Sequence, residues 1–232
     1  MDRAVSTVAP GDAEPTPGPL PAGAEEGRTA RKRRAILAAA TEVFLQHGYV
    51  GASMDEVAAR AGVSKQTVYK QFADKQHLFA EIVLGTTVQV VDGFAAAYAS
   101  TLDEATDVRQ AFRDLARRSL DILIQPGMAP LRRLIIAEAD RFPAISTAWF
   151  EQGFHQALVL LGESMTRLAE RGMLRELPDP TLAAYQFAGL VMYKPMNQVM
   201  FAGTQAQPAA EELEHIADRA AEAFLAAYGT GR

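Results

Sequence analysis

The sequence predicts an all-α fold of about nine helices, on three observations. From residue 28 onward, apolar residues recur three and four positions apart, the spacing of one helix face. Glycine and proline divide this part of the chain into segments of helical length. No segment shows the run of alternating β-branched residues that is typical of a strand. We therefore expect helices packed on helices.

The first 27 residues differ in composition from the rest. They contain five of the twelve prolines and almost no large apolar residue. Such a segment cannot bury enough apolar surface to offset the entropy lost on ordering it, so residues 1–27 are predicted to be a disordered tail. The tail has no apolar signal-peptide core, and no later stretch is uninterrupted enough for a membrane span. We expect a cytoplasmic protein with no membrane partner.

Composition argues against several kinds of chemistry. Hydrophobic residues make up 49% of the 232 residues, which is enough for a buried core. The absence of cysteine excludes disulfides, thiolate zinc sites and cysteine nucleophiles. The histidines are spread over separate predicted helices without ligand spacing, so we expect no metal and no cofactor. Because no phosphate loop, nucleophile elbow or acid-base pair is found, an enzyme is a remote alternative.

Charge is unevenly distributed along the chain. The net charge is −5, yet residues 28–79 hold nine basic and four acidic residues, which leaves −10 on the remainder. This asymmetry is typical of a small DNA-binding module joined to an acidic domain, because only the docking face has to meet phosphates. The alternative is a chance cluster of solvated charges.

The basic segment begins with a predicted helix from about residue 31 to 46, whose large apolar residues share one face. Gly48 is placed to end this helix, since glycine favours the conformation that follows a helix C-terminus. Ser53, with Glu56 three residues later, forms a capping box that opens a short second helix.

A third helix follows after a tight turn. Gly62 lies where such a turn favours positive φ, and Ser64 is placed to cap a helix from about residue 65 to 72. Two short helices joined by a three-residue turn form a helix-turn-helix, whose second helix lies in the major groove. Residues 28–74 are therefore predicted to be a DNA-binding domain.

Side chains at the start of the third helix are candidates for reading bases. Lys65 is suited to guanine, Gln66 to adenine, and Thr67 to a thymine methyl group or a phosphate. The run from Arg31 to Arg34 opposes the helix dipole, and bound phosphates would relieve this. Alternatively, Lys65 is a solvated cap residue and the basic run is an ordinary helix start.

The same segment carries a dense pattern of residues: ILAAA at 36–40, F at 44, GY at 48–49, SMDEVA at 53–58, AGVSK at 61–65, TVY at 67–69, F at 72, K at 75 and LF at 78–79. This pattern resembles the N-terminal domain of the TetR family of bacterial repressors. The resemblance implies a homodimer with a three-helix head, a fourth helix leading to an effector domain, and an interface built from the last two helices. Residues 131–143 further resemble the AefR-like subgroup.

In that family the positions of Tyr69 and Lys75 hold the phosphate backbone, and a phenol and an ammonium at the rim of a basic face suit this role. The alternative for Tyr69 is a core aromatic with an exposed hydroxyl. Ser53 is expected to cap its helix in either case. The candidate DNA-binding residues are Arg31, Arg33, Arg34, Ser53, Ser64, Lys65, Gln66, Thr67, Tyr69, Lys70, Gln71 and Lys75.

Residues 75–232 are predicted to be an effector-binding and dimerisation domain. Beyond the helix that opens at Lys75, helical segments are expected at 83–100, 105–124, 131–141, 147–172, 181–201 and 211–228. The segment 181–201 is apolar nearly all round, so it must be covered on more than one side. Pro195 within it is expected to kink or break the helix.

Aromatic and sulfur-containing side chains are candidates for an apolar effector pocket, although ordinary core packing is the alternative for each of them. The candidate effector-binding residues are Phe112, Trp149, Phe150, Phe154, His155, Tyr185, Ala188, Met192, Tyr193 and Met196. The candidate dimer-interface residues, three and four apart on the last helix, are Leu213, Ile216, Ala220 and Phe224.

These observations together predict a sequence-specific transcriptional repressor. We expect a homodimer on an inverted-repeat operator of double-stranded DNA, released by a small and largely apolar effector. The alternative is a dimeric DNA-binding protein that takes no ligand.

Overall fold

The computed structural model describes residues 22–125, 127–201 and 208–231. The all-α prediction is confirmed: every regular element among the described residues is a helix, apart from one isolated bridge between Leu174 and Gly229. The helices are α1 (Ala22–Gly51), α2 (Met54–Arg60), α3 (Lys65–Gln71), α4 (Lys75–Tyr98), the π-helical η1 (Ala99–Asp103), α5 (Val108–Leu123), α6 (Met128–Ala137), α7 (Pro143–Trp149), the π-helical η2 (Phe150–His155), α8 (Gln156–Glu170), α9 (Pro180–Phe201) and α10 (Ala210–Tyr228).

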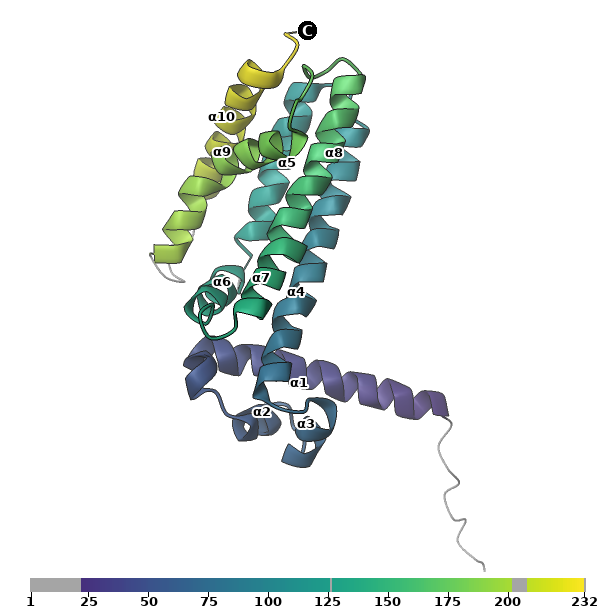
Figure 1. Cartoon of the computed structure of the whole chain (residues 1–232), viewed down its shortest axis with the longest axis vertical. Helices are drawn as coiled ribbons and strands as arrows, with labels where there is room; N and C mark the ends of the chain where they lie inside the picture. The colour runs from purple at the N-terminus through teal and green to yellow at the C-terminus, as the bar shows by residue number, and fades with distance from the viewer. Residues whose placement is uncertain (1–21, 126, 202–207, 232) are drawn as a thin grey trace, which may run out of the picture.

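Figure 1 shows two parts of unequal size. Helices α1 to α3 form the lower part, which we call the head. Helix α4 rises from the head into a bundle with α5, α8, α9 and α10, and α6 and α7 lie at the junction of head and bundle. The head and the bundle are thus joined both by α4 and by the α6–α7 region.

The head forms around apolar residues that the three short helices turn inward. Gly48 has non-helical angles, φ 68° and ψ 176°, so the regular part of α1 ends there as predicted. Phe44, Val57, Val68 and Phe72 are almost fully buried in one cluster. Burying an apolar side chain of this size contributes about 1.5 to 3 kcal/mol, which offsets the weak helix-forming tendency of segments as short as α2 and α3.

Helix α4 is apolar because it passes through two cores. Its first half places Leu78, Phe79 and Ile82 in the head cluster, and its second half places Phe94 and Tyr98 in the bundle cluster. By length and composition alone, α4 with η1 is apolar enough to cross a membrane. The residues that α4 contributes to the two clusters account for part of this composition.

The bundle core is built from close helix contacts around aromatic rings. Phe112 of α5, Phe187 of α9 and Phe224 of α10 lie with ring centroids 4.8 to 5.3 Å apart. At Gly162 on α8, a Cβ atom would lie 3.0 Å from the backbone of Pro180. Glycine at this position therefore allows α8 to approach the start of α9 closely.

Several predicted boundaries are corrected by the structure. Helix α1 begins at Ala22, inside the predicted tail, because its alanine and glutamate residues favour a helix; the rest of the tail lies outside the described residues. The predicted segment 131–141 begins and ends earlier, since α6 spans Met128–Ala137. The predicted segment 147–172 divides into the end of α7, which begins with Pro143 as its first residue, and then η2 and α8. Pro195 lies inside α9 and does not break it.

The predicted dimer-interface residues also need correction. Leu213, Ala220 and Phe224 are at most 3% exposed, and Ile216 packs against the same cluster. Helix α10 turns this face toward α5 and α9 of its own chain. The three-and-four spacing correctly predicts a packed face, but the partner of that face is intramolecular.

Candidate DNA interface and ligand cavity

Two serines fix the ends of the helix-turn-helix. The Ser53 hydroxyl accepts a hydrogen bond from the Glu56 backbone N–H at 3.1 Å, and the Ser64 hydroxyl accepts one from the Thr67 N–H at 3.1 Å. Between the helices Gly62 has φ +64°, a conformation that other residues rarely adopt. Both serines therefore act as the caps that the sequence predicts, and they set the angle between α2 and α3.

The outer face of α3 is exposed to solvent. Lys65, Gln66, Tyr69 and Lys70 are exposed, whereas Val68 on the opposite side is buried. Thr67 and Gln71 are half-buried at the edges of this face. The structure thus brings six of the predicted DNA-binding residues onto one short helix, and Tyr69, 44% exposed, is not a core residue.

Lys65 already has a partner within the head. Its ammonium lies 2.7 Å from the Asp55 carboxylate of α2, and this hydrogen bond raises the pKa of Lys65. The Ser64 and Thr67 hydroxyls are 2.8 Å apart. The pair between Lys65 and Asp55 is exposed, so solvent screens it and a base or phosphate can compete for the ammonium.

Lys75 takes a position that sequence reasoning did not predict. Its ammonium donates to the backbone carbonyls of Tyr49, Val50 and Ala52 at 2.8, 3.3 and 3.0 Å, and lies 4.6 Å from the centre of the Tyr49 ring. These carbonyls belong to the end of α1 and the turn after it. The lysine therefore neutralises a helix C-terminus rather than extending from the surface.

The basic run on α1 divides into two kinds of side chain. Arg31 and Arg34 are exposed. Arg33 instead pairs with Glu81 of α4 and lies over the Phe72 ring, 5.0 Å from its centre. The Arg33 side chain thus makes its contacts within the chain. Of the three arginines predicted to bind DNA, Arg31 and Arg34 are the exposed ones.

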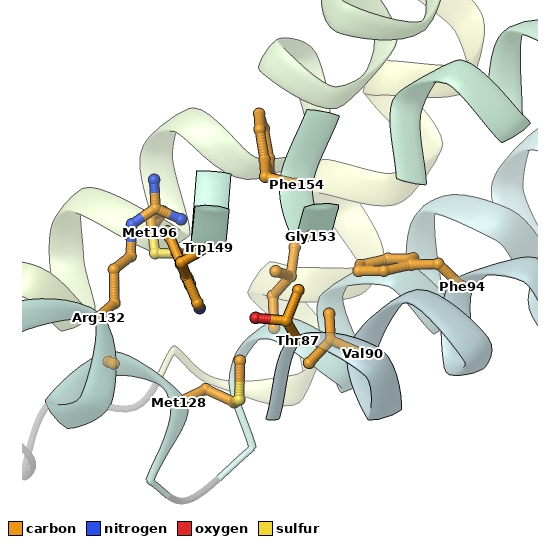
Figure 2. Close-up of a pocket in the computed structure, with 11 residues that line it drawn as sticks. Thr87, Val90, Phe94, Met128, Arg132, Trp149, Gly153, Phe154 and Met196 are labelled. Atoms are coloured by element: carbon orange, nitrogen blue, oxygen red, sulfur yellow. The ribbon is translucent and has the colours of Figure 1, made fainter. Parts of the chain in front are cut away.

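A cavity lies where α4, α6, α7, η2 and α9 meet (Figure 2). Its wall is almost entirely apolar, and its enclosed free volume is about 40 Å³ within a larger open space of about 500 Å³. Gly153 forms part of this wall because its π-helical segment approaches α4, where a Cβ atom would lie 3.0 Å from the Thr87 side chain. The lining residues are Thr87, Val90, Phe94, Leu123, Met128, Ala129, Arg132, Trp149, Gly153, Phe154 and Met196.

Two further spaces adjoin this cavity and share the Phe154 side chain with it. One is a small apolar space of about 20 Å³ that reaches Phe187 and Val191. The other is an open groove of about 400 Å³ along α9, which also shares Arg132 with the cavity. A rotation of the Phe154 ring would therefore change the shape of all three spaces.

The structure sorts the predicted effector-binding residues into two groups. Those that line the cavity or its neighbouring spaces are Trp149, Phe154, Tyr185, Ala188, Met192, Tyr193 and Met196. Phe112 does not, because it is fully buried between Phe187 and Phe224. Phe150 is 43% exposed, and His155 lies behind the wall with its Nδ1 3.0 Å from the Tyr185 hydroxyl.

Sequence reasoning missed the cavity residue with the most distinctive chemistry. Arg132 rises from α6 beside Trp149 and Met196 (Figure 2), and burial lowers its pKa. The signal was present in the spacing, because Leu131, Leu134 and Ile135 define one face of α6 and leave residue 132 on the neighbouring face. Among the residues that the structure describes, no three acidic or histidine side chains come together as a metal site.

Helix α6 connects the cavity to the head. Its buried residues Leu131, Leu134 and Ile135 belong to the head cluster, while Met128 and Arg132 line the cavity. Helix α6 therefore belongs both to the head core and to the cavity wall.

Phe142, which follows α6, closes the junction of head and bundle. The centroid of its ring lies 4.6 Å from that of the Tyr49 ring and 5.7 Å from that of the Phe79 ring. The Tyr49 and Phe79 rings are in turn 5.3 Å apart. Since Tyr49 is also the residue whose carbonyl binds Lys75, the end of α1, the start of α4 and the region after α6 form one packed unit.

The amino-acid sequence matches known protein families over both the head and the bundle. Residues 36–82 match the bacterial regulatory proteins of the tetR family, and residues 110–230 match the C-terminal domain of AefR-like transcriptional repressors. The chain belongs to the TetR family. As a TetR-family protein it is a DNA-binding transcriptional regulator.

Similar proteins give the same assignment for this TetR-family chain. A TetR-family regulator from Mesorhizobium loti MAFF303099 is 44% identical in sequence, with a TM-score of 0.81 over 88% of this chain and 99% of that chain. The flavonoid-responsive regulator FrrA is 27% identical, with a TM-score of 0.65 over 88% of this chain and 100% of its own. The regulator YdeS of Bacillus subtilis is 38% identical over 69% of this chain and 76% of its own.

Other relatives match over shorter stretches. The activator FasR of Mycolicibacterium smegmatis is 39% identical over 80 residues, which span 36% of its length. The repressor BepR of Brucella suis is 38% identical over 58 residues, which span 28% of its length. Because both activators and repressors carry similar heads, membership of the TetR family assigns DNA binding and does not assign the sign of regulation.

Proposed function

We propose that this regulator binds operator DNA as a homodimer in the cytoplasm and represses transcription until a small, largely apolar effector enters the cavity. The observation that carries the proposal is the position of α6, which contributes one face to the head core and the neighbouring face to the cavity wall. A ligand that moves α6 therefore changes the packing under α1 and α4. The ligand changes the affinity for DNA only to the extent that it binds one packing arrangement of α6 more tightly than the other.

The operator is proposed to be an inverted repeat with half-sites about one helical turn, or a small multiple of it, apart. Each chain has one recognition helix, so a two-fold dimer presents two. The exposed Lys65, Gln66, Tyr69 and Lys70 supply polar groups for base edges and phosphates, and Arg31 and Arg34 add positive charge on α1.

The homodimer is proposed to form through α9 and the outer face of α10, in place of the buried residues predicted from the sequence. Leu182, Leu190, Tyr193 and Phe201 of α9 are 46% to 87% exposed in the single chain. These helices lie side by side at one edge of the bundle (Figure 1). An exposed apolar surface of this kind is typical of a protein–protein interface.

The effector is proposed to be small and mainly apolar because of the lining of the cavity. Aromatic rings and methionine thioethers adapt to flat or irregular ligands. The structural relative FrrA is named as responsive to flavonoids, which are small aromatic molecules. A ligand-free DNA-binding dimer is the alternative, and the three adjoining spaces around Phe154 favour the ligand-binding function.

The experiment combines operator selection with a variant that fills the spaces adjoining the cavity. Genomic fragments bound by the protein are selected, and a fluorescent operator is then titrated with hydrophobic candidates against wild type, Ala188→Trp and the control Ala96→Trp. Ala188 lines both of the spaces that adjoin the cavity and is 7% exposed, whereas Ala96 is exposed on α4. We expect an effector to weaken operator binding of wild type and control by about 5- to 150-fold.

Ala188→Trp is expected to mimic the effector or to abolish the response while remaining dimeric. Release of all three proteins at the same ligand midpoint would place the effector site elsewhere. Failure of every candidate to release wild-type protein, together with a normal operator affinity of Ala188→Trp, would support the ligand-independent alternative.

A further inference from the structure

Five arginines of the described chain are half-buried, and one of them has no hydrogen-bond partner there. Arg113 pairs with Asp218, and Arg117 donates to the Ala210 carbonyl at 3.1 Å. Arg33 pairs with Glu81, and Arg133 donates to the Val199 carbonyl at 2.9 Å. Arg132, next to Arg133 on α6, donates to no carboxylate, carbonyl or hydroxyl among the described residues. Its side chain nevertheless lines an apolar cavity.

The Arg132 guanidinium lies near two aromatic rings and donates no hydrogen bond among the described residues. The guanidinium carbon lies 5.6 Å from the centre of the Trp149 ring and 5.9 Å from the centre of the Phe154 ring. A cation over the face of an aromatic ring is attracted electrostatically, and this attraction is not a hydrogen bond. The N–H groups project in the plane, where they form paired hydrogen bonds with a carboxylate.

Leaving such a group without a partner is costly. Burial of a charge is unfavourable unless hydrogen bonds and an opposite charge offset it. The lowered pKa of Arg132 has this cause, since desolvation disfavours its charged form. A ligand that brings an anion to the cavity would supply the missing partner, while a neutral ligand would bury the guanidinium further without one.

We propose that the effector is a monoanionic carboxylate with a compact apolar body, and that its carboxylate pairs with Arg132 at the cavity wall. This inference rests on the proposed function, because it takes the cavity to be the effector site. The apolar body would lie against Val90, Phe94 and Met128, on the inner side of the cavity. Carboxylate recognition by Arg132 then determines which apolar molecules are effectors.

The test measures binding without DNA. Trp149 is the single tryptophan of the chain and lines the cavity, so its fluorescence reports an occupant directly. The purified full-length protein is titrated with hydrocinnamate, with its primary amide, which has nearly the same shape, and with phenylpropylamine, which has the opposite charge. Octanoate in the same series separates aromatic from aliphatic bodies.

The variants isolate the role of the guanidinium. Arg132→Met keeps the length of the side chain and removes its charge, and Arg132→Lys keeps the charge and removes the paired donors. Arg109→Met is the matched control, because Arg109 is exposed on α5 and its loss changes the net charge equally. Circular dichroism checks that each variant is folded.

Wild type and Arg109→Met are expected to bind at least one of the two carboxylates about tenfold or more tightly than the amide, which is the effect of one charge-assisted hydrogen-bonded pair. Arg132→Met is expected to lose this preference, and Arg132→Lys to keep part of it. Because Arg132→Met removes a charge that lacks a partner, it is also expected to unfold no earlier than wild type, unlike a variant that loses a structural contact.

Equal binding of carboxylate and amide by wild type would overturn the inference, as would retention of the preference in Arg132→Met. Failure of both carboxylates to perturb Trp149 would overturn it as well. If a neutral molecule releases the operator while carboxylates do not bind, the inference fails and the proposed function stands. If carboxylates bind through Arg132 but never affect operator affinity, the proposed function fails and the carboxylate site stands.

Discussion

Lys75 offers a direct choice between two roles, a phosphate contact and a cap for the end of α1. The perturbation is Lys75→Met, which keeps the apolar stem and removes the ammonium. In the structure the ammonium donates to three carbonyls, two of them at 2.8 and 3.0 Å, and lies over the Tyr49 ring. Its structural role predicts a loss of stability, and its role as a phosphate contact predicts a loss of DNA affinity.

The expected loss of stability follows from these contacts. A hydrogen bond to a charged group contributes about 1.5 to 3 kcal/mol, and the cation over the ring adds about 0.5 to 1 kcal/mol. Because Lys75 is half-exposed and its three bonds share one ammonium, the contributions are not additive. We expect Lys75→Met to lower the free energy of unfolding by about 2 to 3 kcal/mol.

The assay compares Lys75→Met with Lys70→Met. Lys70 is exposed on α3 and has no ion-pair partner among the described residues, so its loss should change stability by less than about 0.5 kcal/mol. Stability is measured by urea denaturation at fixed protein concentration, and operator affinity is measured at several salt concentrations. Lys70→Met should reduce the salt slope by about one unit and Lys75→Met should leave it unchanged. The opposite pattern, with stable Lys75→Met and a reduced slope, would refute the capping role.

Three further predictions test the head and the dimer. Gln66→Ala should relax the preference at one or two base positions by about 1 to 3 kcal/mol, and binding-site selection that returns the wild-type motif would contradict this role. Ser64→Ala removes the cap of α3 and should lower the free energy of unfolding by about 1 kcal/mol, measured by urea denaturation; an unchanged value would show that the cap contributes nothing. Tyr193→Asp places a charge on the exposed face of α9 and should dissociate the dimer in sedimentation experiments, whereas Gln156→Asp should not.

The head could be predicted from the sequence because local interactions determine it. Ser53 and Ser64 cap their helices as predicted, and Gly62 adopts the positive φ that its turn requires. Each of these features depends on residues within four positions of it. A pattern of this range is visible in one dimension, and the dense motif around it specifies the family.

The bundle was harder to predict because a helical spacing shows that a face is buried and not what covers it. Phe224 has the spacing expected of an interface, yet it packs against Phe112 and Phe187 of its own chain. For the same reason Phe112 is in the core and does not reach the cavity. Which side of an apolar helix faces solvent depends on contacts between segments far apart in the sequence.

The two charged residues with unexpected roles show a second limit. Lys75 and Arg132 belong to a residue type that is usually exposed, and composition predicts solvated side chains for both. The carbonyls that bind Lys75 lie at the end of α1 and in the turn after it, 23 or more residues earlier in the chain. The nearer of the two rings beside Arg132 is Trp149, which follows it by 17 residues. Only the folded arrangement reveals these environments.

If the proposed function is right, occupancy of the cavity changes the spacing of the two heads in a dimer. The chain has no cysteine, so Ala38→Cys on the exposed side of α1 allows a single spin label on each head. The distance between labels is measured by electron spin resonance for the free protein, with operator, and with a ligand identified by its effect on Trp149 fluorescence. We expect one narrow distance with operator and a different distribution with the ligand. If the distance distribution is the same with operator and with a ligand that releases the DNA, the change in head spacing is contradicted. A protein in which no second label lies within measurable range would contradict the dimer.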